Sequence, residues 1–295
     1  IRTGRLVTPY YSPKGQEAIP AALSVSLRED DQLCTIYRGV HDILAKGMPL
    51  EALWAEQGGR ETGACKGRGG PLHFTHAESG VMVTTGIVGS SMPIANGLAW
   101  AAQMEGSDRV VVASFGDGAS NIGAFHESLN LASLWKLPVI FLCQNNRYGE
   151  HTRYEKSTSA KRIADRGVAY DMAALRIDGN DPVEVWKAGH DAVARARAGD
   201  GPTLIEAMTF RFHGHVMGDA DKYMDKEEKA AAIAADPTKL FRARLLQQGV
   251  ADETALSAIE SEIDARIEAA IAFALNSPWP DPAGLTDYVL AKQVA

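Results

Sequence analysis

Two short polar motifs carry residue types that bind phosphate and a divalent metal ion. The first is Gly116-Asp117-Gly118, and the second is Asn145-Asn146. Glycine lets a backbone come close to a phosphate, and free N–H groups at the start of a helix attract its negative charge. Asp117 would offer Mg²⁺ an anionic oxygen and Asn146 a neutral one, both hard ligands of the kind this ion prefers. Together the motifs predict a site for a metal-bound phosphate.

The sequence between the motifs supports this interpretation, because either motif alone is common in ordinary turns and loops. The apolar run 109–115 predicts a strand that leads into the first motif. Pro138 ends the following helix, and the apolar run 139–143 predicts a buried parallel strand that leads into the second. In an open α/β sheet, ligands bind at the carboxyl ends of the strands. The helix is predicted by apolar residues at helical spacing, namely Ile122, Phe125, Leu129 and Ala132.

The rest of the chain alternates between strands and helices, which predicts an α/β fold with a mostly parallel sheet and helices on both faces. Further strands are predicted at 32–38, 174–177 and 203–212, and helices at 14–27, 49–57, 91–104, 182–198 and 236–249. A glycine-rich stretch, 58–70, could hold phosphate or be only a loop. We predict a single domain over residues 1–295, with a helical C-terminal extension at about 236–276. Its last helix carries an apolar stripe that we expect to be buried against this subunit or a partner, namely Leu256, Ile259, Ile263, Ile267, Ile271 and Leu275.

Composition argues against several classes of function. The 295 residues are 45% hydrophobic and 23% charged, and a net charge of −7 without a basic run disfavours a nucleic-acid partner. No apolar stretch approaches the roughly 20 residues of a membrane span. Three widely spaced cysteines (Cys34, Cys65 and Cys143) favour a reducing compartment over a disulfide framework or a zinc site. We expect a cytoplasmic protein, although the start at Ile1 suggests a trimmed N-terminus and leaves organelle targeting open.

Motifs along essentially the whole chain resemble those of one enzyme family. Besides the two motifs above, they are Gly15-Gln-Glu-Ala18, Tyr37-Arg38-Gly39, Gly67-Arg-Gly-Gly70, Gly86-Ile-Val-Gly89, Leu134-Trp-Lys-Leu-Pro138 and Thr209-Phe-Arg-Phe-His-Gly-His215. The chain resembles the alpha subunit of the thiamine-diphosphate-dependent first component of 2-oxo acid dehydrogenase complexes. The stretch 86–89 favours the pyruvate and acetoin type over the branched-chain type.

This resemblance implies a thiamin-diphosphate-binding fold, with thiamine diphosphate and Mg²⁺ as cofactors. The metal ligands would be the side chains of Asp117 and Asn146 and the carbonyl of Tyr148. The remaining cofactor contacts would come from Tyr37, Arg38, Arg211 and His215 at the diphosphate, from Gly86 and Val88 at the aminopyrimidine, and from Gly116, Gly118 and Ala119 at the phosphates. An arginine suits such a role because its planar fork stays charged and binds bidentately.

The resemblance also implies decarboxylation of a small 2-oxo acid and transfer of the acyl group to a lipoyl-bearing acyltransferase. His215 is the main acid–base candidate, because an imidazole titrates near neutral pH. His213, its neighbour across one glycine, is either a second catalytic group or only structural. Tyr11 stands where relatives often carry a substrate-side histidine. It could hydrogen-bond a substrate oxygen, but it could not act as a base near pH 7 without a large pKa shift.

Other departures from the family pattern concern the substrate pocket and regulation. Val40 occupies a position where histidine is common, with His41 displaced by one, and Glu150 replaces an apolar residue that commonly supports the bent cofactor. Val216 follows His215 where mammalian relatives have a phosphorylated serine, and residues 213–230 contain no serine or threonine. We therefore expect pyruvate first, with acetoin or another small 2-oxo acid close behind.

The family assembles as an α₂β₂ heterotetramer in which the beta subunit supplies a glutamate that activates the cofactor. We therefore expect this chain to be inactive alone. The helix 91–104 and the apolar stripe are candidate interfaces, although packing within the subunit explains them equally well. Two other functions stay open, a split transketolase-like subunit and a non-catalytic scaffold. A transketolase-like subunit would need several histidines and arginines gathered to bind sugar hydroxyls and phosphate, and the sequence does not show them concentrated. The intact Asp117, Asn146, Arg211 and His215 argue against a scaffold.

Overall fold

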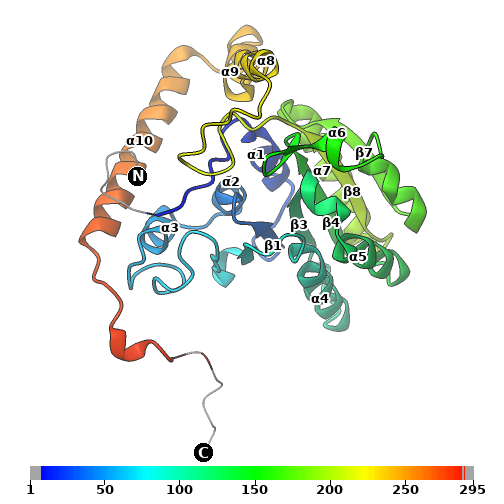
Figure 1. Ribbon diagram of the computed structural model, residues 1–295, viewed down its shortest axis with the longest axis horizontal. Helices are drawn as coiled ribbons and strands as arrows, with labels where there is room; N and C mark the ends of the chain where they lie inside the picture. The colour runs from blue at the N-terminus through cyan, green and yellow to red at the C-terminus, as the bar shows by residue number, and fades with distance from the viewer. Residues whose placement is uncertain (1–7, 288, 290–295) are drawn as a thin grey trace, which may run out of the picture.

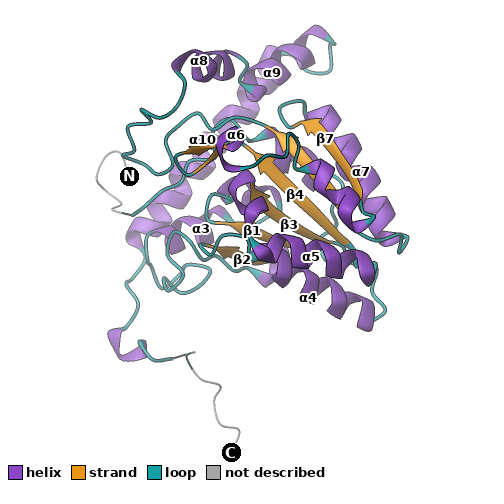
Figure 2. Cartoon of the chain, turned by 45° about the vertical axis from the view of Figure 1, so that its right-hand side comes forward, coloured by secondary structure: helices purple, strands orange, loops and turns teal. Residues whose placement is uncertain are grey.

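The computed structural model describes residues 8–287 and 289. Its centre is a six-stranded sheet in which all neighbouring strands are parallel (Figures 1 and 2). The order across the sheet is β2-β1-β3-β4-β8-β7. The strands are β1 (Gln32–Ile36), β2 (Val81–Thr85), β3 (Val111–Gly116), β4 (Val139–Asn145), β7 (Ala173–Asp178) and β8 (Thr203–Met208). The predicted α/β class with a parallel central sheet is confirmed.

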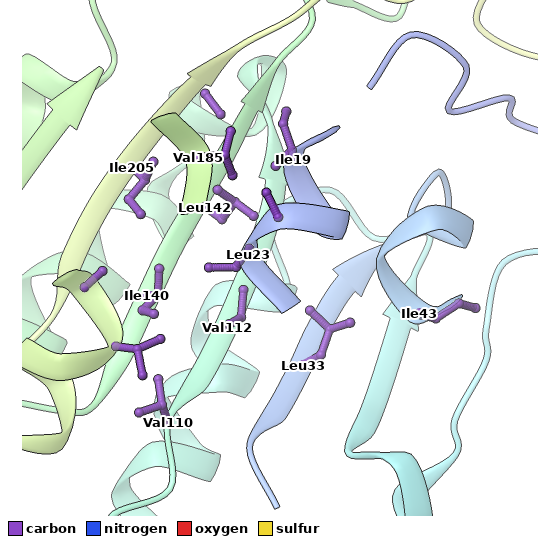
Figure 3. Packing of buried hydrophobic residues seen from close by; sticks show 14 of the residues in the cluster. Ile19, Leu23, Leu33, Ile43, Val110, Val112, Ile140, Leu142, Val185 and Ile205 are labelled. Atoms are coloured by element: carbon purple, nitrogen blue, oxygen red, sulfur yellow. The ribbon is translucent and has the colours of Figure 1, made fainter. Parts of the chain in front are cut away.

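Each face of the sheet buries its own apolar cluster, because successive strand residues point to opposite sides. On one face, Val112 and Ile140 pack with Ile19 and Leu23 of helix α1, as Figure 3 shows. The helices of this face are α1 (Ala18–Ser24), α2 (Val40–Ala45), α3 (Leu50–Gln57) and α7 (Pro182–Arg197). The other face packs on α4 (Ser91–Met104) and α5 (Gly123–Leu134). Because helices cover both faces of the sheet, β3 and β4 are apolar along nearly their whole length.

The remaining elements lie around this core. They are the hairpin β5 (Tyr148–Gly149) and β6 (Thr152–Arg153), the helix α6 (Tyr154–Ser157), the 3₁₀ turns η1 (Ala77–Ser79), η2 (Asp117–Asn121), η3 (Ala164–Tyr170) and η4 (Pro282–Gly284), and the helices α8 (Lys226–Ala234), α9 (Pro237–Gln247) and α10 (Glu253–Asn276). An aspartate side chain caps the first turn of α7, α8, α9 and α10, which fixes where each begins. Within the described residues, no helix is long and apolar enough to cross a membrane.

Some predicted bounds are wrong at their ends. The helix predicted at 14–27 is only α1, because residues 14–17 form a turn closed by the N–H of Gln16 on the Pro13 carbonyl. The strand predicted at 203–212 ends at Met208. Beyond it the chain leaves the sheet, and the Thr209 hydroxyl donates to the carbonyl of Gly15 at 2.9 Å. β2 and α2 have no counterpart among the predicted elements.

Helix α10 lies beside α3, with its C-terminal end nearest that helix in Figure 1. Ala270 and Ala274 are buried there, whereas Ile259 and Ile263 in the first half of α10 remain 53% and 45% exposed. Packing within the subunit therefore leaves part of the apolar stripe uncovered, and burial against a partner stays a prediction. The single-domain organisation over 1–295 also stays a prediction, and residues 1–7, 288 and 290–295 lie outside the described part.

One buried carboxylate organises the glycine-rich stretch 58–70. Glu56, near the end of α3, accepts the backbone N–H groups of Cys65 and Gly67 at 2.7 and 2.8 Å on one oxygen. Its other oxygen accepts those of Gly69 and Gly70 at 2.8 and 3.0 Å. These donors are turned toward Glu56 and not toward a ligand. Of the two interpretations of this stretch, the geometry favours a structural loop.

We predict that Glu56→Gln lowers the free energy of unfolding by about 2 kcal/mol or more. The new amide nitrogen would face two backbone donors, and each unpaired buried donor costs about 1–3 kcal/mol. Urea unfolding measures the change from the midpoint and slope. Glu51→Gln, an exposed change in the same helix, serves as the control and should leave stability unchanged. An unaltered midpoint for Glu56→Gln would contradict the assignment.

Candidate active site

The carboxyl ends of the strands meet along one edge of the sheet, and the predicted site residues follow them. Tyr37 and Arg38 come directly after β1, Asp117 after β3 and Asn146 after β4, while Arg211 lies three residues beyond β8. The chain runs from β1 to β2 in one direction and from β3 to β4 in the other. A topological switch point therefore falls between β1 and β3, where open α/β sheets bind their ligands.

Asp117 is a buried carboxyl group that lacks a full set of partners. It is 2% exposed, and its Oδ2 atom has no hydrogen-bond partner among the described residues. Burial raises its pKa to about 7, even though backbone hydrogen bonds and the charge of Arg211 act in the opposite direction. Because burying an unpaired carboxylate is costly, a cation at Oδ2 would stabilise the ionised form. This orphaned oxygen fits a metal ligand.

The other two predicted metal ligands lie in the segment next to Asp117, whose carboxyl group accepts a hydrogen bond from the Asn146 backbone N–H. A Cβ atom built on Gly149 would lie 3.9 Å from Asp117 Oδ2, and one on Gly118 would lie 3.2 Å from the Cα of Gly149. Asn146 Oδ1 accepts the Tyr148 N–H at 3.3 Å, which ties the two together. A carboxylate, a carboxamide and a carbonyl suit a hard cation such as Mg²⁺. Among the described residues, no group of three or more His, Cys, Asp or Glu side chains could hold a metal ion.

Two buried guanidinium groups lie beside this set without an acidic partner. Arg38 and Arg211 are 4% and 1% exposed, and neither forms a salt bridge within the described part of the chain. Arg38 donates to the carbonyl of His215 at 2.9 Å, and Arg211 donates to that of Glu150 at 2.9 Å. Burial and the neighbouring charge of Arg211 lower the pKa of Arg38 to about 10. An anion between them would stabilise these two buried like charges. A diphosphate suits this role because planar guanidinium groups bind phosphate oxygens bidentately.

The His215 ring lies against both guanidinium groups. Its Nδ1 atom is 3.3 Å from a nitrogen of Arg38 and 3.4 Å from one of Arg211. Tyr11 and Tyr37 meet the ring edge-on, with centroids 5.4 and 6.0 Å away. Burial, followed by the charges of Arg38 and Arg211, lowers the pKa of His215 to about 4. The ring is therefore neutral at pH 7, and a bound anion would raise its pKa by offsetting the two cations.

The structure places the other predicted residues less centrally. The His213 side chain is exposed, and its carbonyl accepts a hydrogen bond from Arg211 at 3.1 Å. Gly86 directly follows β2, and the carbonyl of Thr85, the last residue of that strand, accepts the Tyr37 N–H at 3.1 Å. Val88 is 52% exposed. Gly116, Gly118 and Ala119 span the end of β3 and the turn η2, so the helix predicted to follow the first motif begins only with α5 at Gly123. Their roles stay predictions.

Three residues that the sequence analysis does not single out complete this edge of the site. Asp219 accepts the backbone N–H of His215 at 2.6 Å and the Tyr223 hydroxyl at 2.7 Å. Tyr223 packs on His151, with ring centroids 4.6 Å apart, and His151 is 6.2 Å from His215. All three lie in loops or turns without a motif, so only the folded chain brings them together.

Two departures from the family pattern have clear positions. Val40 is buried at the start of α2, and the His41 side chain hydrogen-bonds to Gln144 of β4. Because the Gln144 amide nitrogen donates to Asp42 at 2.8 Å, its oxygen accepts from His41 at 2.9 Å. Glu150 has a left-handed backbone, with φ of 51°, and presents its carbonyl to Arg211.

The fold is that of an α/β subunit whose carboxyl edge gathers two buried guanidinium groups and the orphaned carboxylate of Asp117. The family model for the dehydrogenase E1 component matches residues 4–283, and the chain belongs to this family, which is thiamine-diphosphate dependent. It is 41% identical over 281 residues to the alpha subunit of the Bacillus subtilis acetoin:2,6-dichlorophenolindophenol oxidoreductase, covering 95% of this chain and 84% of the relative. It is 36% identical over 284 residues to the Porphyra purpurea pyruvate dehydrogenase E1 alpha subunit, covering 94% and 83%. These relatives are alpha subunits of enzymes with several subunits.

We predict that inorganic diphosphate raises the thermal unfolding midpoint of the protein and that Arg38→Met abolishes this effect. A ligand that binds only the folded state stabilises it by about 2.7 kcal/mol at 100 times its Kd. Differential scanning fluorimetry with increasing diphosphate measures the shift. Arg242→Met in α9, whose partners Glu253 and Glu260 lie in α10, is the control that should keep the full shift. Equal shifts in wild type and Arg38→Met would contradict the anion site.

We predict that, measured without added cofactor, His215 makes the protein less stable as the pH falls from about 6.5 toward 4. The folded-state pKa of about 4 lies below the ordinary value of 6.5, so the unfolded chain binds the additional proton in this window. The stability difference between wild type and His215→Gln, measured by urea unfolding at several pH values, isolates this contribution. It should favour the variant increasingly as the pH is lowered. A difference that stays constant across the window would show that the His215 pKa is not depressed.

Proposed function

We propose that this chain is the alpha subunit of a dehydrogenase that uses thiamine diphosphate and Mg²⁺ to decarboxylate a small 2-oxo acid. The acyl group would pass to a lipoyl-bearing acyltransferase. The observation that carries this proposal is the pair of buried guanidinium groups, Arg38 and Arg211, on the same edge of the sheet as the orphaned carboxylate of Asp117. These unpaired charges of opposite sign suit a ligand that combines an anionic diphosphate with a divalent cation.

The residues of this chain hold the cofactor at its diphosphate end. Arg38 and Arg211 would bind diphosphate oxygens, with Tyr37 beside them, while Asp117, Asn146 and the Tyr148 carbonyl would hold Mg²⁺. Gly116, Gly118 and Ala119 would keep the backbone close to the phosphates, and, apart from Gly116 and its chain neighbours, no atom of the described residues lies within 4 Å of where a Gly116 Cβ would be. Gly86 and Val88, at the end of β2, border the aminopyrimidine. When bound, thiamine diphosphate supplies a nucleophilic carbon and a sink for the electrons released with carbon dioxide.

His215 is the group of this chain best placed to hold or move a proton. Burial and the two guanidinium groups keep its ring neutral at pH 7, and the diphosphate charge would bring its pKa back toward neutrality, where general acid–base catalysis is most effective. Tyr11 meets the same ring edge-on and would donate a hydrogen bond to a substrate oxygen. His213, whose side chain is exposed, has the weaker case for a catalytic role.

A beta subunit is the expected partner, in an α₂β₂ assembly. The relatives are named as alpha subunits, which implies a second type of subunit in those enzymes. In this chain, apolar side chains are left exposed on two helices. Ile259 and Ile263 lie on α10, and Trp100 and Met104 lie on α4, where Trp100 packs on Trp135 with ring centroids 5.3 Å apart. Exposed apolar patches of this kind typically mark protein–protein interfaces.

Acetoin is the second candidate substrate. The Bacillus subtilis acetoin relative is 41% identical to this chain, against 36% for the Porphyra purpurea pyruvate relative. Pyruvate stays the first proposal. Two histidines common in the family on the proposed substrate side are replaced by Tyr11 and Val40 in this chain, so we expect the choice between the two substrates to be made there.

We predict turnover of one small 2-oxo acid or of acetoin by this chain co-expressed with its genomic beta-subunit neighbour. The assay follows reduction of an artificial electron acceptor with added thiamine diphosphate and Mg²⁺. The panel contains pyruvate, acetoin, 2-oxobutanoate, branched-chain 2-oxo acids and a ketose phosphate. The chain without its partner is the control and should be inactive.

Each other outcome contradicts part of the proposal. Turnover of the ketose phosphate alone would favour a split transketolase. Failure to bind thiamine diphosphate in the assembled protein would favour a scaffold. Cofactor binding without turnover of any compound would contradict the proposed substrate class while leaving the cofactor site standing.

A further inference from the structure

Gln16 lies directly behind Asn146 and belongs to none of the groups assigned so far. It is buried in the turn before α1, and its amide makes two hydrogen bonds. Its nitrogen donates to the carbonyl of Pro13 at 3.3 Å, and its oxygen accepts from the amide nitrogen of Asn146 at 3.0 Å. The three residues therefore form a hydrogen-bonded chain that ends at the proposed metal site.

This chain determines which way round the Asn146 amide lies. A carbonyl can only accept, so Pro13 must face the nitrogen of Gln16, and the oxygen of Gln16 then faces Asn146. Asn146 must therefore donate its amide nitrogen to that oxygen, so its own oxygen points to the opposite side. There Oδ1 accepts the Tyr148 N–H at 3.3 Å. The two ends of a carboxamide are nearly equal in shape, but only the oxygen can bind a cation.

The turn that carries Gln16 is held rigidly against the segment that delivers Arg211. The Gln16 N–H donates to Pro13 at 3.0 Å, and the Phe212 N–H donates to the carbonyl of Lys14 at 3.2 Å. Gly15 has φ of 98°, and a Cβ there would lie only 2.6 Å from the Phe210 carbonyl and the Phe212 ring. A side chain at this position would push the turn away from Asn146. The local backbone therefore fixes the place of Gln16.

We propose that Gln16 is a positioning residue that holds the Asn146 amide with its oxygen, and not its nitrogen, toward the metal ion. Gln16 would act through Asn146 and not through a contact of its own with the metal or the cofactor. Without it, the Asn146 amide could turn over and present its nitrogen, which repels a cation. This inference rests on the proposed function, because it requires that Asn146 bind Mg²⁺.

The test compares the Mg²⁺ requirement of Gln16 variants in the assembled α–β protein. At a fixed, saturating concentration of thiamine diphosphate, isothermal titration with Mg²⁺ gives the apparent metal affinity without any measurement of turnover. Gln16→Met removes the acceptor and should weaken Mg²⁺ binding on the order of tenfold or more, as is typical when a partner of a metal ligand is lost. Gln16→Glu keeps an oxygen toward Asn146 and should stay within about threefold of wild type, since only that partner is needed.

Two further variants separate orientation from general damage. Gln57→Met is the matched control, because Gln57 is another buried glutamine whose amide donates to a proline carbonyl, that of Pro9 at 3.0 Å. It should leave the Mg²⁺ affinity unchanged. In an Asn146→Asp background both terminal atoms are oxygens, so orientation no longer matters. Adding Gln16→Met there should not weaken Mg²⁺ binding further, whereas a merely structural role would lower the affinity in both backgrounds.

The outcomes distinguish this inference from the proposed function. If wild type binds thiamine diphosphate equally well without Mg²⁺, the proposed metal site is wrong. If wild type requires Mg²⁺ but folded Gln16→Met binds it normally, the positioning role of Gln16 is wrong. Should Gln16→Met fail to fold, a folded Gln16→Glu with a tenfold or greater loss of affinity would overturn the inference equally well.

Discussion

The structure depends on one electrostatic constraint, the burial of two guanidinium groups in a single site without an acidic partner. Arg38 enters from the end of β1 and Arg211 from the segment after β8, and His215 lies between them. Their mutual repulsion and their desolvation both disfavour positive charge in the site, as the lowered pKa values of Arg38 and His215 reflect. The backbone carbonyls of His215 and Glu150 accept hydrogen bonds from the two guanidinium groups and hold them in place without neutralising their charge. The site is thus prepared for an anion.

On the same edge of the sheet, Asp117 is a buried acidic group without a cationic partner among the described residues, the reverse of the two arginines. Its buried Oδ2 atom has no partner among residues 8–287 and 289, and burial raises its pKa to about 7. A ligand with an anionic diphosphate and a divalent cation would relieve both imbalances at once. This explains why cofactor and metal are expected to bind together, and why the orientation of one amide, that of Asn146, would matter to both. The parallel sheet contributes by bringing the ends of β1, β3, β4 and β8 to one edge.

The sequence alone predicts the centre of this arrangement but not its surroundings. β3 and β4 were predictable because both are buried on two faces and therefore apolar throughout, and Asp117 and Asn146 follow from their place after these strands. β2 lies at the edge of the sheet and contains two threonines, and α2 has only six residues, so neither carries a clear periodic pattern. Asp219 and His151 reach the site through loops, whose course depends on tertiary contacts such as the hydrogen bond from the His215 N–H to Asp219.

The central claim is that Asp117 and the guanidinium pair together hold a metal-bound diphosphate, and calorimetric titration of the Asp117→Ala assembly tests it most directly. The co-expressed α–β protein is titrated with thiamine diphosphate in the presence and absence of Mg²⁺. For wild type, the account predicts tight binding that requires Mg²⁺. For Asp117→Ala, it predicts an unaltered fold by circular dichroism and loss of the Mg²⁺-dependent part of the affinity. Undiminished, Mg²⁺-dependent binding by this variant would contradict the account.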